Sequence, residues 1–417
     1  MIHIFTEHIT PRLIYVLDFC FTEKGEAYEL VSTREEWNKL EVKSLNYSNQ
    51  EIKCDLQINP QGILFESEIY QSKSVVFNDG NFEIDGVNDE LGLIFYLLVR
   101  YKSYYSQNLD AHGRLNAEHN TLVKFGLNKV AVVDRLVKSI WEKLSLDYSK
   151  VQNGFKIIPT FDIDVAWAYK NRKFIRSVGA MLKGKKPIER LKVYAGVSQD
   201  PYDTYSYIRE IAAKTEQIIC FTLLGDWGKY DKNIHWENYS YGSLIRGLNL
   251  EGGLGIHPSY ASYLDVDKVK LEINRLETIT GHEILKSRQH FLRLKIPESY
   301  NTLVAAGIKN DYSMGFADDF GFRAGTSFPF YYFDLKQNKS TDLLIHPFAY
   351  MDSAMKDYLK LKPEQAKEVI YDLIAEVKSV GGQFISIWHN SSIHDKGEWK
   401  GWKTVLDFTV EKGLEQE

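Results

Sequence analysis

The strongest constraint on the fold is a regular alternation of strand-like and helix-like segments from about Val151 to the C-terminus. Short apolar runs, typical of buried strands, alternate with longer stretches that carry apolar residues at helical spacing. We expect strands at 156–161, 217–224, 253–257, 289–294, 310–313, 343–347 and 383–388. We expect helices at 205–215, 239–248, 266–279, 298–306, 353–361 and 364–380. This repetition predicts parallel strands with helices outside them, either as a (β/α) barrel or as a doubly wound sheet.

Glycine-rich nucleotide-binding motifs are missing from the sequence. No G-x-G-x-x-G follows the first of these strands, and no G-x-x-x-x-G-K-[ST] occurs anywhere. Because such motifs form the phosphate sites of nucleotide-binding α/β folds, their absence favours the barrel over the doubly wound sheet. We therefore expect an α/β fold of the (β/α) barrel type over residues 151–417.

The first 150 residues lack this alternation and predict a smaller α+β domain. Two domains, 1–150 and 151–417, are also expected because 417 residues exceed what one hydrophobic core normally holds. We expect strands at 12–21, 62–65, 74–77 and 82–84, and helices at 89–105 and 129–144. The polar loop 110–114 (DAHGR) fits a contact to the second domain or to a ligand, or a salt-bridged turn. We expect this domain to pack on the barrel and to take no part in the chemistry.

Charge and composition exclude several classes of protein. The net charge is −5 and no long basic run is present, which argues against a nucleic-acid partner. The three cysteines are far apart and form no C-x-x-C pair, so neither a disulfide framework nor a cysteine zinc site is expected. No apolar run approaches the ~18 residues of a membrane span, and the N-terminus lacks a signal-peptide pattern. We therefore expect a cytoplasmic protein without a membrane span.

Two carboxylates end the first strand of the alternating region. In the run IIPTFDID at 157–164, Asp162 and Asp164 are two residues apart, so strand periodicity places both on one face. Two like charges this close need a compensating cation or a shared proton. The pair therefore indicates a metal site or a general base, although both residues would also suit caps of the following turn and helix.

Histidines end several of the other expected strands. These are His257, His290, His346 and His389. Each one alone would suit a hydrogen-bonded core or capping residue. In a parallel barrel, however, the carboxyl ends of the strands meet on one face, where active sites are built. The coincidence on five strands, counting the aspartate pair, therefore predicts a single polar cluster.

Five segments in this part of the chain resemble one known superfamily. They are TFDID at 160–164, FTLLGDW at 221–227, GIHPSYAS at 255–262, RQHFLR at 288–293 and IWHN at 387–390. Their order and spacing over roughly 155–410 resemble the polysaccharide deacetylase superfamily (NodB homology, carbohydrate esterase family 4). The chain looks most like a bacterial branch with an extra N-terminal domain of unassigned role, which the loop 110–114 and the preceding helix also resemble.

This resemblance implies a distorted (β/α)7 barrel that hydrolyses N-acetyl or O-acetyl groups of sugars. It also implies a divalent metal, often zinc, in an Asp-His-His triad, where the metal polarises the acetyl carbonyl and activates water. The implied roles are general base for Asp162, metal ligand for Asp164 and His257, general acid for His389, and orientation of the base for Arg288 or Arg293.

The chain departs from the family at its second histidine motif. The family pattern H-[ST]-x-x-H places two ligands four residues apart, but Ala261 stands four residues after His257 and cannot bind metal. One carboxylate and one imidazole hold a metal weakly without a third ligand. We expect His290 to replace the missing ligand, because its strand should neighbour that of His257. We expect His346 to be hydrogen-bonded further round the barrel.

Three functions fit these residues. The first is a metal-dependent carbohydrate deacetylase with a rearranged third ligand. The second is a barrel that lost the metal and binds glycans without turnover. The third is a metal-free hydrolase that uses the aspartate pair with His389. Metal content and acetate release discriminate the first two.

Several side chains are candidates for substrate contacts. Trp227, Tyr260 and Trp388 lie on or just after expected strands, where an aromatic ring could stack on a sugar or pack in the core. Arg323, in the Gly-rich stretch 315–330, fits a carboxylate or phosphate of the substrate, or a surface ion pair of an ordered insertion. A cytoplasmic location would make a nucleotide- or lipid-linked glycan precursor the consistent substrate.

Overall fold

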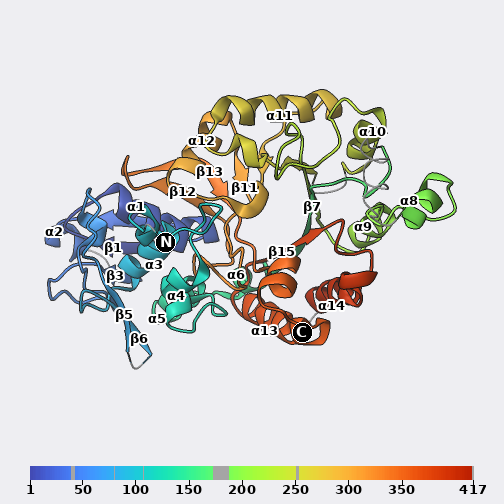
Figure 1. Cartoon of the computed structure of the whole chain (residues 1–417). Helices are drawn as coiled ribbons and strands as arrows, with labels where there is room; N and C mark the ends of the chain where they lie inside the picture. Colours follow the sequence, from blue (N-terminus) through green and yellow to red (C-terminus); the bar gives the residue numbers. More distant parts are fainter. Residues whose placement is uncertain (39–42, 79, 107, 172–186, 250–252, 416–417) are drawn as a thin grey trace.

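The computed structural model describes residues 1–38, 43–78, 80–106, 108–171, 187–249 and 253–415 (Figure 1). Its larger sheet has nine strands in the order β12-β13-β11-β10-β9-β8-β7-β15-β14. Neighbouring strands are parallel except for the antiparallel pair β12 and β13. The strands are β7 (Lys156–Ile163), β8 (Ile219–Thr222), β9 (Leu254–Ile256), β10 (Lys286–Ser287), β11 (Asn310–Asp311), β12 (Phe330–Asp334), β13 (Lys339–Ile345), β14 (Tyr350–Met351) and β15 (Gln383–His389).

The predicted α/β class with parallel strands is confirmed, but the sheet is not a closed barrel. Its edge strands are β12 and β14, and no strand pairing joins them within the described residues. Between β13 and β14 the chain runs as an irregular segment that donates single hydrogen bonds, from Phe348 N to Met314 O (2.9 Å) and from Ala349 N to Ile385 O (2.8 Å). Only these single hydrogen bonds, and no strand pairing, join the segment between β13 and β14 to β15 and to the segment after β11, so the ring of strand pairs stays open within the described residues.

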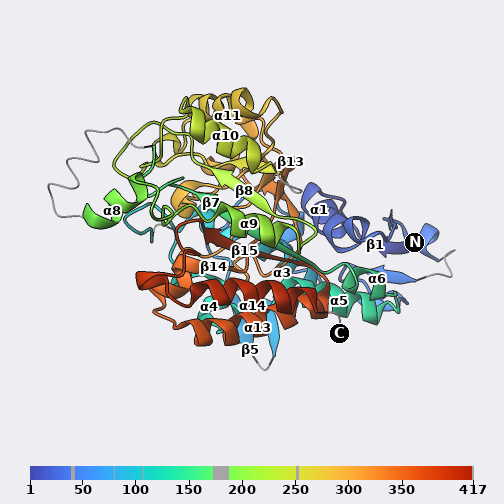
Figure 2. The ribbon, with the colours of Figure 1, turned by 90° about the vertical axis from the view of Figure 1, so that its right-hand side faces the viewer.

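Helices cover the outer face of this sheet. They are α9 (Tyr205–Ala212), α10 (Tyr239–Gly247), α11 (Val266–Thr280), α12 (Glu298–Ala306), α13 (Pro363–Val380) and α14 (Trp402–Leu414). Helix α8 (Pro187–Tyr194) lies beyond α9, away from the sheet (Figure 1). In α13, buried Ile370, Ile374 and Val377 recur at helical spacing, and the helix stops at Gly381, whose φ of 89° suits glycine. Figure 2 shows α13 and α14 side by side beneath β15 and β7, with α10 and α11 on the opposite side.

The other face of the sheet encloses a second, smaller core. Along β15, Ile385 and Ile387 belong to this core, whereas Phe384 and Trp388 belong to the main core under the helices. This alternation follows from the two-residue period of a strand, and both faces are apolar because both are covered. The smaller core fills the inside of the curved sheet, so polar side chains at the carboxyl ends of the strands lie above a packed floor.

Two expected elements near these strand ends are irregular. The segment 289–294, expected as a strand, begins after the two-residue β10 and forms the 3-10 turn η6 (His290–Leu292). Positive φ angles at Phe291 (60°) and Leu292 (52°) are incompatible with an extended strand. The helix expected at 353–361 is one π-helical turn, η7 (Ala354–Tyr358).

The N-terminal region, defined here as residues 1–150, has a separate parallel sheet with the order β2-β1-β3-β4. Its strands are β1 (Ile2–Phe5), β2 (Tyr28–Val31), β3 (Ser44–Asn46) and β4 (Leu56–Gln57), and β5 (Val75–Asn78) and β6 (Asn81–Ile84) form an antiparallel hairpin. Its helices are α1 (Pro11–Cys20), α2 (Arg34–Trp37), α3 (Glu90–Leu98), α4 (Thr121–Lys124), α5 (Val132–Lys143) and α6 (Ser149–Gln152). The hairpin and helix α5 confirm the predictions for those segments. The helix predicted over 89–105 is confirmed only in its first part, because α3 ends at Leu98 and Arg100 has a positive φ of 56°.

Two predicted strands of this region are wrong. Residues 12–21 form helix α1, because Thr10 caps it by accepting a hydrogen bond from Leu13 N (3.1 Å) and Pro11 fits its first position. Residues 62–65 contain the 3-10 turn η2 (Ile63–Phe65), entered through Gly62 at φ 110°.

One hydrophobic core runs through both parts of the chain. Buried apolar side chains from β1, α1, α3 and α5 form a single cluster with those of β7, β13, α13 and α14. Polar contacts cross the same boundary: Tyr15 Oη donates to Tyr331 O (2.8 Å), and buried Asp134 accepts from Ser327 N and Oγ (both 2.7 Å). The N-terminal region therefore packs against the larger sheet through a shared core, and we retain the division at residue 150 as a proposal.

Candidate active site

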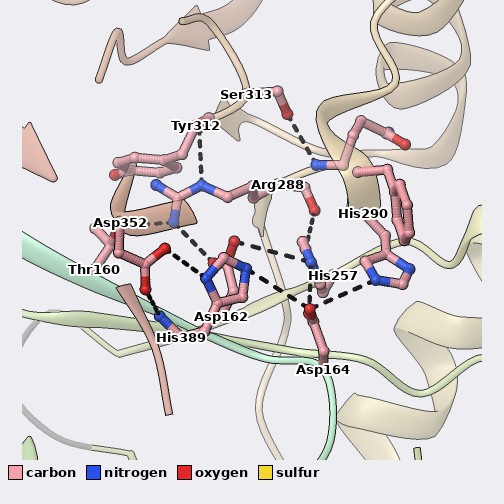
Figure 3. Close-up of polar contacts among 12 residues, drawn as sticks. Thr160, Asp162, Asp164, His257, Arg288, His290, Tyr312, Ser313, Asp352 and His389 are labelled. Carbon is pink, nitrogen blue, oxygen red and sulfur yellow. Dashed lines mark hydrogen bonds and ion pairs between the residues drawn. The ribbon is translucent and has the colours of Figure 1, made fainter. Parts of the chain in front are cut away.

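Most of the predicted polar residues lie together at the carboxyl edge of the larger sheet (Figure 3). Asp162 is the penultimate residue of β7, Asp164 follows β7, His257 follows β9, Arg288 follows β10, His290 begins η6, and His389 ends β15. Parallel strands β10, β9, β8, β7 and β15 are consecutive in the sheet, so their carboxyl ends share one edge. This topology brings together residues up to 227 positions apart in the sequence (162 to 389).

Asp164, His257 and His290 form a candidate metal-binding triad. One ligand atom from each residue lies within 4.8 Å of the others. Asp164 Oδ1 is 3.1 Å from His257 Nε2, and Asp164 Oδ2 is 3.6 Å from His290 Nε2. Asp164 Oδ1 is buried and accepts no hydrogen bond within the described residues. A buried carboxylate oxygen without a donor is costly, and a cation would satisfy it.

Acceptors behind the two histidines orient both rings toward this point. His257 Nδ1 is 2.5 Å from the carbonyl oxygen of Arg288, and His290 Nδ1 is 2.9 Å from Asp231 Oδ1. Because a carbonyl and a carboxylate only accept, both Nδ1 atoms carry the proton. In a neutral imidazole each Nε2 then has a free lone pair, and both lone pairs face Asp164. Two imidazoles and one carboxylate are a donor set that zinc binds with one coordination position open.

The charges of this triad perturb its ionisation strongly. Burial alone would raise the pKa of Asp164, but His290, His257 and His389 hold it well below its ordinary value. Burial alone would lower the pKa of His290, but Asp164 and Asp231 raise it to about 9. In the metal-free protein at neutral pH, a proton on His290 Nε2 therefore neutralises part of the charge of Asp164. A metal ion would have to displace that proton.

Arg288 fixes the second carboxylate, Asp162. The fully buried guanidinium donates to Asp162 Oδ1 (2.9 Å) and Thr160 Oγ1 (2.7 Å) through Nη1, and to Tyr312 O (3.0 Å) through Nε. The other oxygen, Asp162 Oδ2, lies 3.9 Å from His257 Nε2, on the triad side. The arginine thus holds Asp162 by one oxygen and leaves the other turned toward the triad.

Of the two arginines considered as partners of Asp162, only Arg288 contacts it. Arg293 donates instead to His112 O (2.8 Å) and Tyr260 O (3.0 Å). Its guanidinium also lies over the rings of Tyr260 and Tyr263, at 4.0 and 3.7 Å from their centroids. Arg293 therefore joins the loop 110–114 to the segment that carries His290.

His389 is held by a carboxylate that sequence analysis missed. Buried Asp352, which follows β14, accepts from His389 N and lies close to His389 Nδ1, both at 2.8 Å. His389 Nε2 then points at Asp164 Oδ2, 3.7 Å away. Burial lowers the pKa of His389, but Asp352 and Asp164 together raise it to about 10. The ring is therefore protonated at neutral pH, with its Nε2 proton facing the triad.

A small cavity of about 170 Å³ opens at these residues. Its walls include Asp162, Asp164, His257, His290 and His389, together with Gln289, Tyr358 and, from the N-terminal region, Arg114. This volume is below the ~300 Å³ at which pockets for whole drug-sized ligands begin. The cavity therefore suits a group of a few heavy atoms.

The four predicted substrate contacts lie outside this cavity wall. Trp227 is 47% exposed, with the Lys232 ammonium 4.7 Å from its ring centroid. Tyr260 packs on Tyr230 with centroids 4.2 Å apart. The remaining two are buried: Arg323 donates to Gly315 O (3.0 Å), and Trp388 donates to Tyr350 Oη (3.2 Å). Their placement gives Arg323 and Trp388 structural hydrogen bonds, and leaves Trp227 and Tyr260 beyond the cavity.

His346 is hydrogen-bonded away from the triad, as its sequence position predicts. Its ring lies between Gln383 Oε1 (3.1 Å) and Asn310 Oδ1 (3.0 Å) and stacks on Tyr312 at 4.3 Å. Burial lowers the pKa of His346 to about 4, so the ring is neutral. Sequence analysis also missed Asp231, which lies in the irregular segment after β8, where no periodicity marks a buried side chain.

Comparisons with known proteins give a family match for the N-terminal region and one distant structural likeness. Residues 2–149 match a family of unknown function (DUF7033). A solved structure described as "putative polysaccharide deacetylase from Mycobacterium smegmatis" aligns with a TM-score of 0.39 and 14% identity, over 63% of this chain and 85% of that chain. No curated protein matches the chain. Among the described helices, none is long and apolar enough to cross a membrane.

Proposed function

We propose that the protein is a metal-dependent hydrolase that removes acetyl groups from an amino sugar or another glycan. The observation that carries this proposal is that His257 Nε2 and His290 Nε2 both face the carboxylate of Asp164, whose Oδ1 accepts no hydrogen bond within the described residues. Asp162 and His389 lie beside this triad. The acetyl and glycan parts of the proposal rest on the sequence resemblance of 160–164, 255–262 and 387–390 to polysaccharide deacetylases.

Asp164, His257 and His290 would hold the divalent metal, with zinc as the first candidate. When bound, such an ion polarises a carbonyl oxygen and makes a water molecule more acidic. This arrangement replaces the missing second histidine of the family motif by a histidine from the turn that follows the next strand of the sheet, β10. Ala261 itself donates its backbone N–H to Asp231 (3.2 Å), so its position belongs to the support of His290.

Asp162 is placed to take the proton from water. Arg288 occupies one carboxylate oxygen, and the other faces the cavity beside the triad. A charged carboxylate within reach of both the triad and the cavity can act as a general base for attack on the acetyl carbonyl. Thr160 and Tyr312 fix Arg288 in turn, so the base has little freedom to turn away.

His389 is placed to deliver a proton to the leaving amine or alcohol. Asp352 fixes its Nδ1 and supports the positive charge of the protonated ring, so the Nε2 proton points into the cavity. Asp162 and His389 form a neighbouring pair on adjacent strands, at matched positions of β7 and β15. Base and acid therefore flank one small cavity, as the two proton transfers of amide or ester hydrolysis require.

The alternative, a glycan-binding protein without metal or turnover, is favoured by the replacement at Ala261. Tag-free protein analysed by elemental mass spectrometry decides between the two. We expect about one equivalent of zinc or a related cation in the wild type, lost in Asp164→Ala, His257→Ala and His290→Ala. The exposed His282, replaced by alanine, is the matched control and should leave the metal in place.

Acetate release from acetylated amino sugars then tests the reaction. Metal together with acetate release by the wild type supports the hydrolase. A wild type that stays metal-free after incubation with zinc would contradict it and favour the glycan-binding alternative. Acetate release that persists in the three metal-ligand variants would favour the metal-free use of the aspartate pair with His389.

A further inference from the structure

We propose that the loop 110–114 of the N-terminal region is a clamp that holds the turn 290–293 and thereby positions His290 as the third metal ligand. In this arrangement Arg114 and Arg293 are positioning residues. The inference rests on the proposed metal site, and it assigns a role to the region that matches a family of unknown function.

The turn after His290 has a backbone that does not persist without support. Phe291 and Leu292 both have positive φ, 60° and 52°, which is the left-handed region that non-glycine residues rarely adopt. Two such residues in succession are strained, and strain of this kind persists only where the surroundings hold it in place. Because His290 immediately precedes them, its direction depends on what holds this turn.

Two arginines tie the turn to the loop reciprocally. Arg114 donates through Nη1 to the carbonyl oxygen of Phe291 (3.0 Å), and Arg293 donates through Nε to the carbonyl oxygen of His112 (2.8 Å). Each segment thus supplies one guanidinium and one backbone acceptor to the other. Arg293 also donates to Tyr260 O (3.0 Å), which joins the segment after β9 to the same unit.

The loop itself is rigid enough to act as a clamp. Asp110 accepts hydrogen bonds from His112 N (2.8 Å) and Arg114 N (2.9 Å), and its Oδ2 binds Arg114 at Nε and Nη2 (both 2.7 Å). Arg114 Nη2 also donates to Tyr358 Oη (3.1 Å). The guanidinium is buried, so these bonds fix its orientation with little competition from water.

Aromatic packing closes the same contact. The His112 ring lies 5.0 Å from the ring of Phe291 and 5.5 Å from that of Tyr230, measured between centroids. Phe291 packs against His290 at 4.8 Å. Tyr230 immediately precedes Asp231, the carboxylate that orients His290 Nδ1. The clamp therefore joins the two supports of the third ligand, its backbone turn and its carboxylate partner.

Hydrogen–deuterium exchange of the metal-free protein tests the clamp without any metal. In Arg114→Ala we expect faster exchange of the amides at 288–293. In Arg114→Lys we expect an intermediate exchange rate, because an ammonium group cannot make all the hydrogen bonds of the planar guanidinium. The matched control is Arg135→Ala. It breaks another arginine–carboxylate pair between the N-terminal region and the rest of the chain, because Arg135 binds Glu376 on helix α13. This pair is far from the turn 290–293 in sequence. The control should leave exchange at 288–293 unchanged, which separates the clamp from general docking of the two parts.

Zinc affinity, measured by competition with a chelator, is the second readout. We expect the dissociation constant to rise ~10-fold to ~100-fold in Arg114→Ala, as for other changes behind metal ligands, and not in Arg135→Ala.

Unchanged exchange and unchanged zinc affinity in a folded Arg114→Ala would overturn the clamp. A wild type without zinc affinity would overturn the proposed function instead, while the exchange data would still decide the clamp. If Arg114→Ala does not fold, His112→Ala is the second variant. It removes the ring contacts of His112 and the hydrogen bond between its Nδ1 and Tyr260 Oη (3.3 Å), but keeps the backbone carbonyl that accepts from Arg293. It should accelerate exchange at 288–293 more moderately, and unchanged exchange there would count against the proposal.

Discussion

Replacing Asp231 with asparagine removes the negative charge behind His290 and keeps the shape of the side chain. Asp231 Oδ1 binds His290 Nδ1 (2.9 Å) and Tyr260 N (2.8 Å), and Oδ2 accepts from Ala261 N (3.2 Å). An asparagine whose oxygen takes the Oδ1 position keeps the first two bonds but turns its NH₂ group toward the N–H of Ala261. We therefore expect two losses, a weaker bond to His290 and a repulsive contact between two donors.

The expected magnitude follows from the role of such partners in metal sites. Replacing a group that orients a metal-binding histidine typically lowers metal affinity ~10-fold to ~100-fold, or about 1.4 to about 2.8 kcal/mol. Proton binding to His290 makes this loss of metal affinity depend on pH, because Asp231 is one of the groups that raise the pKa of His290 to about 9. In the wild type a proton must leave His290 before metal binds, and in the variant it leaves more easily. The loss of zinc affinity should therefore be larger at pH 8 than at pH 6.

Chelator competition at these two pH values measures the effect. Asp226→Asn is the matched control, because Asp226 lies in the same segment after β8 but is exposed and pairs with Arg275. The control should bind zinc like the wild type at both pH values. Equal zinc affinity of Asp231→Asn and wild type at pH 8 would refute the assignment of His290 as a ligand oriented by Asp231. A loss that is larger at pH 6 than at pH 8 would refute the proton competition.

Three further changes test the rest of the site. Asp162→Asn should keep the metal but lower the rate of acetate release ~100-fold or more, since it removes the general base; full activity in a kinetic assay would exclude that role. Arg288→Met should lower the free energy of unfolding by about 3 to 5 kcal/mol in urea titrations, because it leaves the carboxylate of Asp162 buried without its partner; a loss below about 1 kcal/mol would contradict this. Asp352→Asn concerns His389, whose pKa is raised to about 10 from the ordinary ~6.5. The stability that Asp352 adds should therefore be fully present below about pH 6.5 and decline as the pH rises toward 10, measured by urea unfolding of chelator-treated protein. A difference in the free energy of unfolding between wild type and Asp352→Asn that grows over this pH range would contradict the prediction.

The main polar cluster could be predicted from residues at the ends of expected strands, because the position of strand ends depends on topology alone. Asp164, His257 and His290 are brought together once the strands are parallel and consecutive, whatever the exact shape of the sheet. Closure of the barrel could not be predicted in the same way. It depends on the irregular segment between β13 and β14, whose bonds to Met314 and Ile385 follow from packing and have no sequence period.

The supporting residues were out of reach for related reasons. Asp231 and Asp352 come from irregular segments, where a buried aspartate looks like any turn residue. The choice between Arg288 and Arg293 stayed open because it depends on the left-handed turn at 291–292, which no sequence period predicts and which directs Arg293 toward the loop 110–114. Helix α1 was mistaken for a strand from its apolar run, although Thr10 and Pro11 are a helix start that the sequence displays.

Residues 1–150 share one hydrophobic core with the rest of the chain, and this constrains the evolution of the two parts. A gene that encoded only one of the two parts would yield a polypeptide with the apolar sides of α1 and α5, or of β13 and α13, facing water. Such surfaces favour aggregation over solubility. Recombination that exchanges one part must therefore supply a surface that still packs against the other part. The two parts are expected to evolve together as a single unit.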